Sequence, residues 1–274
     1  MQGNRTLKRF AVIGLGAITG EIIRCLAALQ ESETLCGILV RPGRLDEAKE
    51  RAAGIRVVDS LEALLDRDPD VIAECAGHGA MREFAGDILA RGTDLLCSSV
   101  GVLADREFAS ALMRAARARL LIPSGAIAGL DGLLAARTAG LREVTYTSVK
   151  PPIAWLGTPG EERVAAAGGK RVVFFEGTAR EAAMQYPQNA NVGVAVSLAG
   201  LGLDRTAVKL VSDPAATGPL GVIEAQGDFG RFRFEILAYA SPSNPKTSVL
   251  TAHSVVMALR EGMAFEARLR QLVP

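Results

Sequence analysis

Aromatic residues, histidines and net charge are all scarce in this sequence. Aromatic residues make up 5% of the 274 positions, and 31 basic residues nearly balance 30 acidic ones. Because surfaces that bind nucleic acid are basic and often carry exposed aromatic side chains, this composition argues against nucleic acid and favours a small-molecule partner. Only two histidines are present, which leaves few candidates for acid–base catalysis.

Long apolar runs and paired cysteines are also missing. No stretch approaches about eighteen consecutive apolar residues, and residues 1–8 have no apolar signal core, so we expect a cytoplasmic protein without membrane contact. The four cysteines form no C-x-x-C pair and have no histidine at metal-ligand spacing. We expect buried thiols and no metal. A redox or nucleophilic role for Cys75 or Cys97, near predicted strand ends, is the minor alternative.

A glycine turn between a strand and a helix is the clearest positive feature. Residues 10–13 form an apolar run typical of a buried strand, and helical spacing begins at Ile18. Gly14 suits a tight turn, and Gly16 lets the backbone approach a phosphate at the helix N-terminus. Thr19 stands where the common third glycine would fall. This pattern predicts a dinucleotide site, and the alternative is an ordinary strand-to-helix turn with a glycine cap.

The end of the second predicted strand decides which dinucleotide binds. That strand covers residues 35–41, and an acidic residue at its tip would hold the ribose 2′-hydroxyl of NAD. Arg41 stands there instead, followed by Arg44, and guanidinium groups suit a 2′-phosphate. The sequence therefore favours NADP, or use of both cofactors, over strict NAD. The alternative is that Arg41 is a solvated loop charge.

Strands and helices alternate along the first half of the chain. This alternation predicts a doubly wound parallel sheet of the Rossmann type, with its ligand crevice at the carboxyl ends of the strands. Ala76, Gly77 and His78 fall at one such end. The predicted elements are strands at 70–77, 94–100 and 120–125 and helices at 79–91 and 105–118.

A second pattern begins near residue 128. Phe232, Phe234 and Ile236 alternate with charged residues, as in a strand with one buried face. We predict a second α+β domain on a mixed sheet, with residues 157–169 as a mobile loop. The predicted limits are 1–127 for the dinucleotide-binding domain, completed by a C-terminal helix over 245–274, and 128–244 for the second domain. The predicted strands are 142–150, 171–176, 206–212, 219–226 and 230–239, and the helices are 129–139, 178–186 and 191–202.

Several motifs are spread over nearly the whole chain. They are Gly14-Leu-Gly-Ala-Ile18, Glu74-Cys-Ala-Gly-His78, Ser124-Gly-Ala-Ile-Ala-Gly-Leu-Asp131, Lys150-Pro-Pro152, Phe175-Glu-Gly-Thr-Ala-Arg-Glu-Ala182, Tyr186-Pro-Gln-Asn-Ala-Asn-Val192, Leu198-Ala-Gly-Leu-Gly-Leu-Asp204 and Asn244-Pro-Lys-Thr-Ser248. Together they resemble one known family, the short L-aspartate dehydrogenases. The resemblance implies oxidation of the aspartate amine with NAD(P)⁺ to iminosuccinate and then oxaloacetate and ammonia, or the reverse reductive amination. It implies a homodimer formed through the second sheet, with 128–244 as the substrate and dimerisation domain. It also implies that Ala126 contacts the cofactor through its backbone and that Asn191 binds near the nicotinamide.

The chemistry of the residues and the family resemblance together give the candidate ligand-binding residues. A dicarboxylate substrate requires cations, and Lys150, Lys246 and Arg180 are candidates, although each could be a solvated or internally paired charge. Asn189 is a further substrate candidate, with a helix N-cap as its alternative role. The expected cofactor-binding residues are Gly14, Gly16, Ala17, Ile18, Arg41, Ala76, Gly77, Ala126 and Asn191.

The sequence departs from the family between Asp213 and Gly227. The family usually carries Asn-Arg-His-Glu there and uses the histidine in proton transfer, whereas alignment by eye puts Gly221 at that position. Glycine cannot transfer a proton, so the catalytic group is unknown. His78, His253 and Glu224 are weak substitutes, and helical spacing favours a core position for His253. The main hypothesis is therefore an aspartate dehydrogenase with altered acid–base groups. Its two alternatives are an oxidoreductase for another small oxo or amino acid, and a cofactor-binding sensor without turnover.

Overall fold

The computed structural model of the chain describes residues 9–241 and 244–267, which divide into two compact units. Unit 1 contains residues 9–99, 111–125 and 251–267 of this part, and unit 2 contains residues 100–110 and 126–241 together with 244–250. Among the described helices, none has the length and apolar character needed to cross a membrane.

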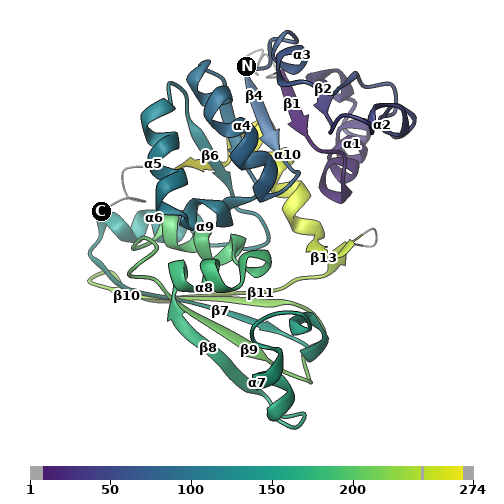
Figure 1. Cartoon of the computed structure of the whole chain (residues 1–274). Helices are drawn as coiled ribbons and strands as arrows, with labels where there is room; N and C mark the ends of the chain where they lie inside the picture. Colours follow the sequence, from purple (N-terminus) through teal and green to yellow (C-terminus); the bar gives the residue numbers. More distant parts are fainter. Residues whose placement is uncertain (1–8, 242–243, 268–274) are drawn as a thin grey trace. The chain divides into compact units, whose positions relative to one another are not determined.

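Unit 1 is built on a mostly parallel sheet, which confirms the predicted Rossmann-type fold (Figure 1). All neighbours pair in parallel except β14, which runs antiparallel to β6 at one edge. All four residues of β1 are buried, as expected for a strand with helices on both faces. In spatial order the strands are β14 (Ala264–Glu266), β6 (Leu120–Pro123), β5 (Asp94–Cys97), β4 (Val71–Glu74), β1 (Phe10–Ile13), β2 (Leu35–Leu39) and β3 (Val57–Val58).

Helices pack around this sheet. Apolar residues of α1, such as Ile22 and Leu26, share a buried cluster with Ile38 of β2 and with Val255 and Leu259 of α10. The chain thus returns near its C-terminal end to complete the core of unit 1. The helical elements of this half of the chain and of that return are α1 (Ala17–Ala28), η1 (Ser32–Thr34), α2 (Leu45–Arg51), α3 (Leu61–Leu65), α4 (His78–Ala90), η2 (Val100–Ala104), α5 (Arg106–Ala115) and α10 (Val249–Glu261).

Unit 2 is built on the predicted mixed sheet. Within it β7 and β9 are parallel and the other neighbours are antiparallel, and α6, α8 and α9 lie along one face (Figure 1). In spatial order the strands are β11 (Gly230–Leu237), β10 (Leu220–Gly227), β7 (Leu141–Lys150), β9 (Ala207–Ser212) and β8 (Val172–Thr178). The remaining elements are α6 (Leu130–Thr138), η3 (Pro152–Trp155), α7 (Glu161–Ala166), α8 (Ala179–Gln185), η4 (Pro187–Asn189), α9 (Asn191–Ala199) and the paired strands β12 (Ala240–Ser241) and β13 (Asn244–Ser248).

Two predicted segments have a different structure. The mobile loop predicted over 157–169 contains helix α7, which is tied down because Arg163 donates to the Phe174 carbonyl at 2.8 Å. The C-terminal helix predicted over 245–274 is also wrong in its limits. Residues 244–248 form β13, α10 ends at Glu261 before Gly262 at φ +68°, and the chain then pairs with β6. Residues 268–274 lie outside the described part.

Candidate functional site

The turn after β1 has a shape that requires glycine. Gly14 has φ +94°, and a Cβ there would lie 2.8 Å from the Cβ of Ala76. Thr19, at the position of the missing third glycine, is fully buried and its hydroxyl donates to the Gly14 carbonyl at 2.8 Å. Threonine is therefore compatible with this turn because it satisfies a turn carbonyl.

The N-terminus of α1 forms an anion cradle. Gly16 is the N-cap, no side chain caps the helix, and its first turn holds no acidic residue. A Cβ at Gly16 would meet nothing within 4 Å, so the backbone is open to a ligand there. Unpaired N–H groups and the helix dipole attract a phosphate at such a position. These residues fit the pyrophosphate of a dinucleotide.

A cavity of about 800 Å³ opens beside this turn. It is lined by the carboxyl ends of β1 and β2 and by the segments that follow β1, β2, β3 and β4, all of them in unit 1. Of the residues predicted to bind the cofactor, Gly14, Gly16, Arg41 and Ala76 line this cavity. Ala17 and Ile18 follow in α1, Gly77 is the N-cap of α4, and Ala126 and Asn191 belong to unit 2.

Arg41 and Arg44, which both line the cavity, have different partners. Arg44 holds Glu47 through two nitrogens, at 3.0 Å from Nε and 2.7 Å from a terminal nitrogen. The Arg41 side chain makes no hydrogen bond or ion pair with any residue in the described part of the chain, and it is exposed. Arg41 is thus the better placed of the two to meet a ligand charge.

Glu74, at the end of β4, is a residue whose role the sequence reasoning missed. Its carboxylate is fully buried and accepts four hydrogen bonds: from the N–H groups of Ala76 at 2.7 Å, Gly77 at 2.6 Å and Ser99 at 3.0 Å, and from the Ser99 hydroxyl at 3.0 Å. Burial raises the pKa of Glu74, and these bonds oppose the shift. Glu74 therefore fixes the loops after β4 and β5. The sequence did contain a sign of this role, since Glu74 is an acidic residue at the end of an otherwise apolar strand.

Lys150 and Asn189, both predicted to bind substrate, lie together. The Lys150 ammonium donates to Asn189 Oδ1 at 2.6 Å and lies 5.2 Å from the centre of the Trp155 ring. Burial lowers the pKa of Lys150 to about 8. This amine can exchange a proton near neutral pH.

Neither asparagine candidate is a helix cap. The N-cap of α9 is Ala190, and Asn191 is the first residue of the helix. Asn191 Oδ1 accepts the Gly101 N–H at 2.8 Å, which ties α9 to the η2 segment within unit 2. The N-cap alternative for Asn189 is therefore wrong.

Arg180 and Lys246 are the other two cations predicted to bind substrate, and the structure describes the side chain of Arg180 only. Arg180 grips Asp204 through two nitrogens at 2.7 and 2.9 Å and also donates to the Ala104 carbonyl. The Arg180 guanidinium is thus held inside unit 2, which favours the alternative of an internally paired charge over a substrate clamp. Lys246 lies in β13, and its side chain is outside the described residues.

A side chain at Gly221 would crowd Ile127. Gly221 lies in β10 opposite Ser148 of β7, and a Cβ there would come within 2.9 Å of Ile127 Cδ1 and 3.5 Å of the Tyr146 hydroxyl. Burial raises the pKa of Tyr146 to about 12, so this hydroxyl stays protonated at neutral pH. Glu224, one of the weak substitutes, is exposed and paired with Arg233 at 2.9 Å.

The predictions for the histidines and cysteines need two corrections: His253 does not lie in the core, and Cys25 and Cys75 are only partly buried, unlike the predicted buried thiols. His253 was predicted to lie in the core, but its side chain is 48% exposed and its Nδ1 lies 3.4 Å from Cys25 Sγ. The helix presents this position to α1 rather than to the sheet. His78 opens α4. All four cysteines are free, and burial raises the pKa of Cys75 to about 12 and that of Cys97 well above its usual value, which leaves no reactive thiolate there.

Fold and cavity together define the class of protein. Unit 1 combines a Rossmann-type sheet, a glycine turn and an open helix N-terminus, and residues 14–120 match the NAD-binding domain of homoserine dehydrogenase. Residues 131–262 match the C-terminal domain of aspartate dehydrogenase. The chain is an NAD(P)-dependent oxidoreductase.

Relatives narrow this class to one family. The chain is 45% identical to the L-aspartate dehydrogenase of Ruegeria pomeroyi, over 95% of this chain and 94% of the relative. It is 43% identical to that of Cupriavidus necator, over 91% and 95%. The solved aspartate dehydrogenase of Thermotoga maritima matches with a TM-score of 0.70 at 26% identity, over 93% of this chain and 96% of that one. The chain belongs to the L-aspartate dehydrogenase family, as its motifs predicted.

Proposed function

We propose that this protein is an NAD(P)-dependent L-aspartate dehydrogenase. In this reaction L-aspartate would lose a hydride from Cα and a proton from nitrogen, with NAD(P)⁺ as the hydride acceptor, to give iminosuccinate, NAD(P)H and H⁺. Water would then convert iminosuccinate into oxaloacetate and ammonia. The observation that carries the proposal is the 45% identity to an L-aspartate dehydrogenase across both units of the chain. Such identity covers the nucleotide cradle and the α+β unit together.

The cofactor would supply the hydride acceptor, and the cavity of unit 1 would hold its pyrophosphate. We assign the pyrophosphate to the turn and helix start formed by Gly14, Gly16, Ala17 and Ile18. Gly14 shapes the turn, since its N–H donates to the Leu39 carbonyl at 2.8 Å, and the first N–H groups of α1 provide the open cradle. Four further residues are assigned to the rest of the cofactor: Ala76 and Gly77 after β4, and Ala126 and Asn191 near the nicotinamide.

For the cofactor we favour NADP because of Arg41. Its exposed guanidinium lines the cavity without an ion pair among the described residues, so it can bind a 2′-phosphate. Arg41→Gln should weaken NADPH binding at least about tenfold and leave NADH binding nearly unchanged, as measured by fluorescence titration. Arg56→Gln is the matched control, since Arg56 is exposed and outside the cavity lining. Equal loss for both cofactors would contradict the assignment.

For proton transfer we propose Lys150. Its pKa of about 8 provides both the amine that takes a proton from aspartate nitrogen and the ammonium that returns one in the reverse direction. Lys150 lies on β7 two residues beyond Ser148, the partner of Gly221, and therefore on the same face of the strand. Asn189 would orient the amine through their 2.6 Å bond, and Lys246 stays a candidate for a substrate carboxylate.

A direct assay tests the activity. NADPH and NADH consumption should require both oxaloacetate and ammonium, with cofactor binding followed separately. Omission of ammonium is the control for simple ketone reduction. Cofactor binding without turnover on oxaloacetate or on any other 2-oxo acid would reject the dehydrogenase and favour a sensor.

A second candidate is an oxidoreductase for another small 2-oxo or amino acid. It is favoured by one observation: Ile127 fills the space at Gly221 where the family's histidine is expected. An apolar wall there suits a substrate with a less polar side chain than aspartate. Faster turnover of such an acid in the same panel would select this alternative.

We further propose a cytoplasmic homodimer. Four free cysteines suit a reducing compartment. Exposed apolar side chains of unit 2, among them Ile153, Leu156 and Leu237, offer contact area for a second copy. Sedimentation equilibrium should give twice the 28.8 kDa of one chain, and a monomer mass at micromolar concentration would contradict the dimer.

A further inference from the structure

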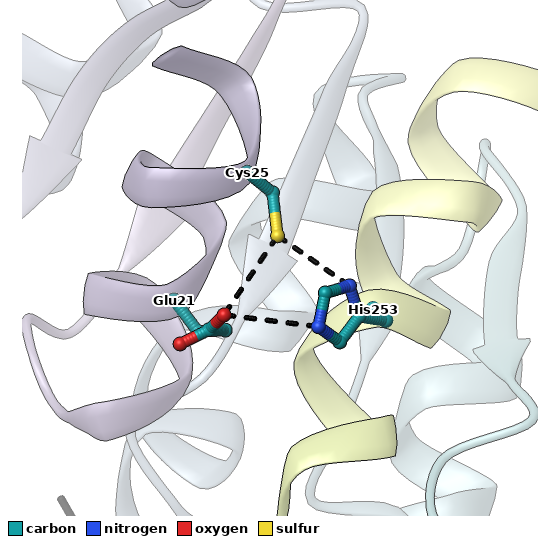
Figure 2. A group of neighbouring side chains, drawn as sticks. All are labelled: Glu21, Cys25 and His253. Atoms are coloured by element: carbon teal, nitrogen blue, oxygen red, sulfur yellow. Dashed lines mark hydrogen bonds and ion pairs between the residues drawn. The ribbon is translucent and has the colours of Figure 1, made fainter. Parts of the chain in front are cut away.

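A cluster of three metal-ligating side chains lies in unit 1, apart from the nucleotide cavity. Glu21 and Cys25 are four residues apart on α1, and His253 reaches them from α10 (Figure 2). Residues four apart share one face of a helix, so the carboxylate and the thiol point the same way. None of the three lines the cavity beside the glycine turn.

The ligand atoms of this cluster lie close enough to converge on one small ion. Cys25 Sγ lies 3.4 Å from His253 Nδ1 and 4.0 Å from Glu21 Oε1, whereas the 3.7 Å from His253 to this oxygen is measured from the other ring nitrogen, Nε2. An ion takes only one of the two nitrogens, and with that choice the three ligand atoms all lie within 4.8 Å of one another. A tetrahedral Zn²⁺ with bonds of about 2.0–2.3 Å separates its ligand atoms by about 3.3–3.8 Å. Side-chain rotations that bring the carboxylate and one imidazole nitrogen closer would therefore place all three atoms on one ion.

The surroundings favour a cation over a reactive thiol. Burial and the Glu21 carboxylate raise the pKa of Cys25, with Arg24 opposing, so the thiol carries its proton at neutral pH. Arg24 pairs with Glu21 through the other oxygen, Oε2, and leaves Oε1 facing the cluster. A metal would displace the thiol proton and balance the two anions.

Access and ligand type identify the ion. The His253 side chain is 48% exposed and that of Glu21 20%, so an ion can enter from solvent and keep water as a fourth ligand. Thiolate sulfur with imidazole nitrogen selects zinc-like metals over Mg²⁺ or Ca²⁺, which prefer oxygen ligands. We propose that Glu21, Cys25 and His253 form a Zn²⁺ site that links α1 to α10.

Cobalt substitution tests this site directly. Untagged full-length protein, reduced and freed of metal by a chelator, is titrated with Co²⁺ and then with Zn²⁺. We expect a sulfur-to-cobalt charge-transfer band, tetrahedral visible bands, and loss of both on adding Zn²⁺. Zn²⁺ should also protect Cys25 from alkylation, which peptide mass spectrometry detects.

Variants assign the ligands. Cys25→Ser should abolish the charge-transfer band, and His253→Gln and Glu21→Gln should each weaken Zn²⁺ binding by about tenfold or more. His78→Gln is the matched control, since His78 is the one other histidine of the chain. It should bind Zn²⁺ like the parent.

Three outcomes would overturn the proposal: no charge-transfer band in the parent, a band that survives Cys25→Ser, or equal weakening by His78→Gln. Circular dichroism melting of each metal-free variant shows whether it is folded. If Cys25→Ser is unfolded, Cys25→Ala and the His253→Gln titration decide. These readouts are independent of turnover, so they stand whether or not the dehydrogenase activity is found.

Discussion

At the scale of single residues, the unusual feature is that a glycine, Gly221, stands where the family's proton-transferring histidine is expected. Gly221 offers no side chain, and Tyr146 beside it holds its proton to a pKa of about 12. Lys150 on the same strand has a pKa lowered to about 8 by burial. Among these three, only the lysine changes protonation near neutral pH, so the chemistry is expected to follow its titration.

Lys150→Met should therefore reduce kcat by about 10²–10⁴-fold. In the oxidative direction the neutral amine is the active form, so kcat should rise with pH and level off above an apparent pKa of about 8. In reductive amination the protonated form is required, and kcat should fall above the same pKa. Both profiles are measured from initial rates at saturating substrate.

Lys150→Arg is the discriminating control. Arginine keeps the positive charge but does not release a proton in this range, so it should be as inactive as Lys150→Met. Substantial activity in Lys150→Arg, or parental pH profiles in either variant, would mean that Lys150 only binds a carboxylate.

A histidine at position 221 should destabilise the protein unless Ile127 is also changed. Because a Cβ at 221 would lie 2.9 Å from Ile127 Cδ1, Gly221→His should lower the free energy of unfolding by about 1–3 kcal/mol. Ile127→Ala should relieve this cost, with a coupling of about 0.5–3 kcal/mol in a double-mutant cycle measured by urea unfolding. Additive effects would show that Ile127 does not fill this space.

At the scale of secondary-structure elements, one carboxylate fixes the loops that follow two parallel strands, β4 and β5. Glu74 binds the N–H groups that follow β4 and the N–H and hydroxyl of Ser99 after β5. Ala76, in the loop after β4, packs against Gly14 in the turn after β1, and both residues line the nucleotide cavity. A shift of the loop after β4 would therefore change this cavity.

Glu74→Gln should cost about 2–4 kcal/mol of unfolding free energy, since an amide nitrogen would face donors in a buried place. Weaker binding of both NADH and NADPH should accompany the loss, measured by urea unfolding and fluorescence titration. Glu33→Gln, at an exposed position, is the control and should change neither. A Glu74→Gln protein of parental stability and affinity would contradict the role given to this carboxylate.

Sequence patterns predicted the elements that carry strong local signals. Buried apolar runs such as β1, and the alternation in β11, were assigned correctly, and the glycine turn predicted the cradle. The missed parts depend on distant partners. His253 meets Cys25 across 228 positions, and α7 is fixed by the Phe174 carbonyl. The spacing of apolar residues along one helix does not reveal contacts with distant segments, so the predicted core position of His253 is wrong.

At the scale of the whole molecule, the units are not separate stretches of chain. Unit 1 takes its described residues from 9–99, 111–125 and 251–267, so no single cut isolates it. Its core combines α1 and β2 with residues of α10, and loss of the C-terminal return would expose that cluster. Experiments on cofactor binding therefore require the full chain.

NADPH at a hundred times its Kd should stabilise the full chain by about 2.7 kcal/mol, which raises Tm by roughly 5–10 °C. Lys150→Met should gain the same shift, because every residue lining the nucleotide cavity belongs to unit 1 and Lys150 belongs to unit 2. Differential scanning calorimetry measures both, with AMP at the same concentration as the control for adenine binding alone. A shift lost in Lys150→Met would place this lysine in cofactor binding, whereas no shift in the parent with NADPH or NADH would refute the cradle itself.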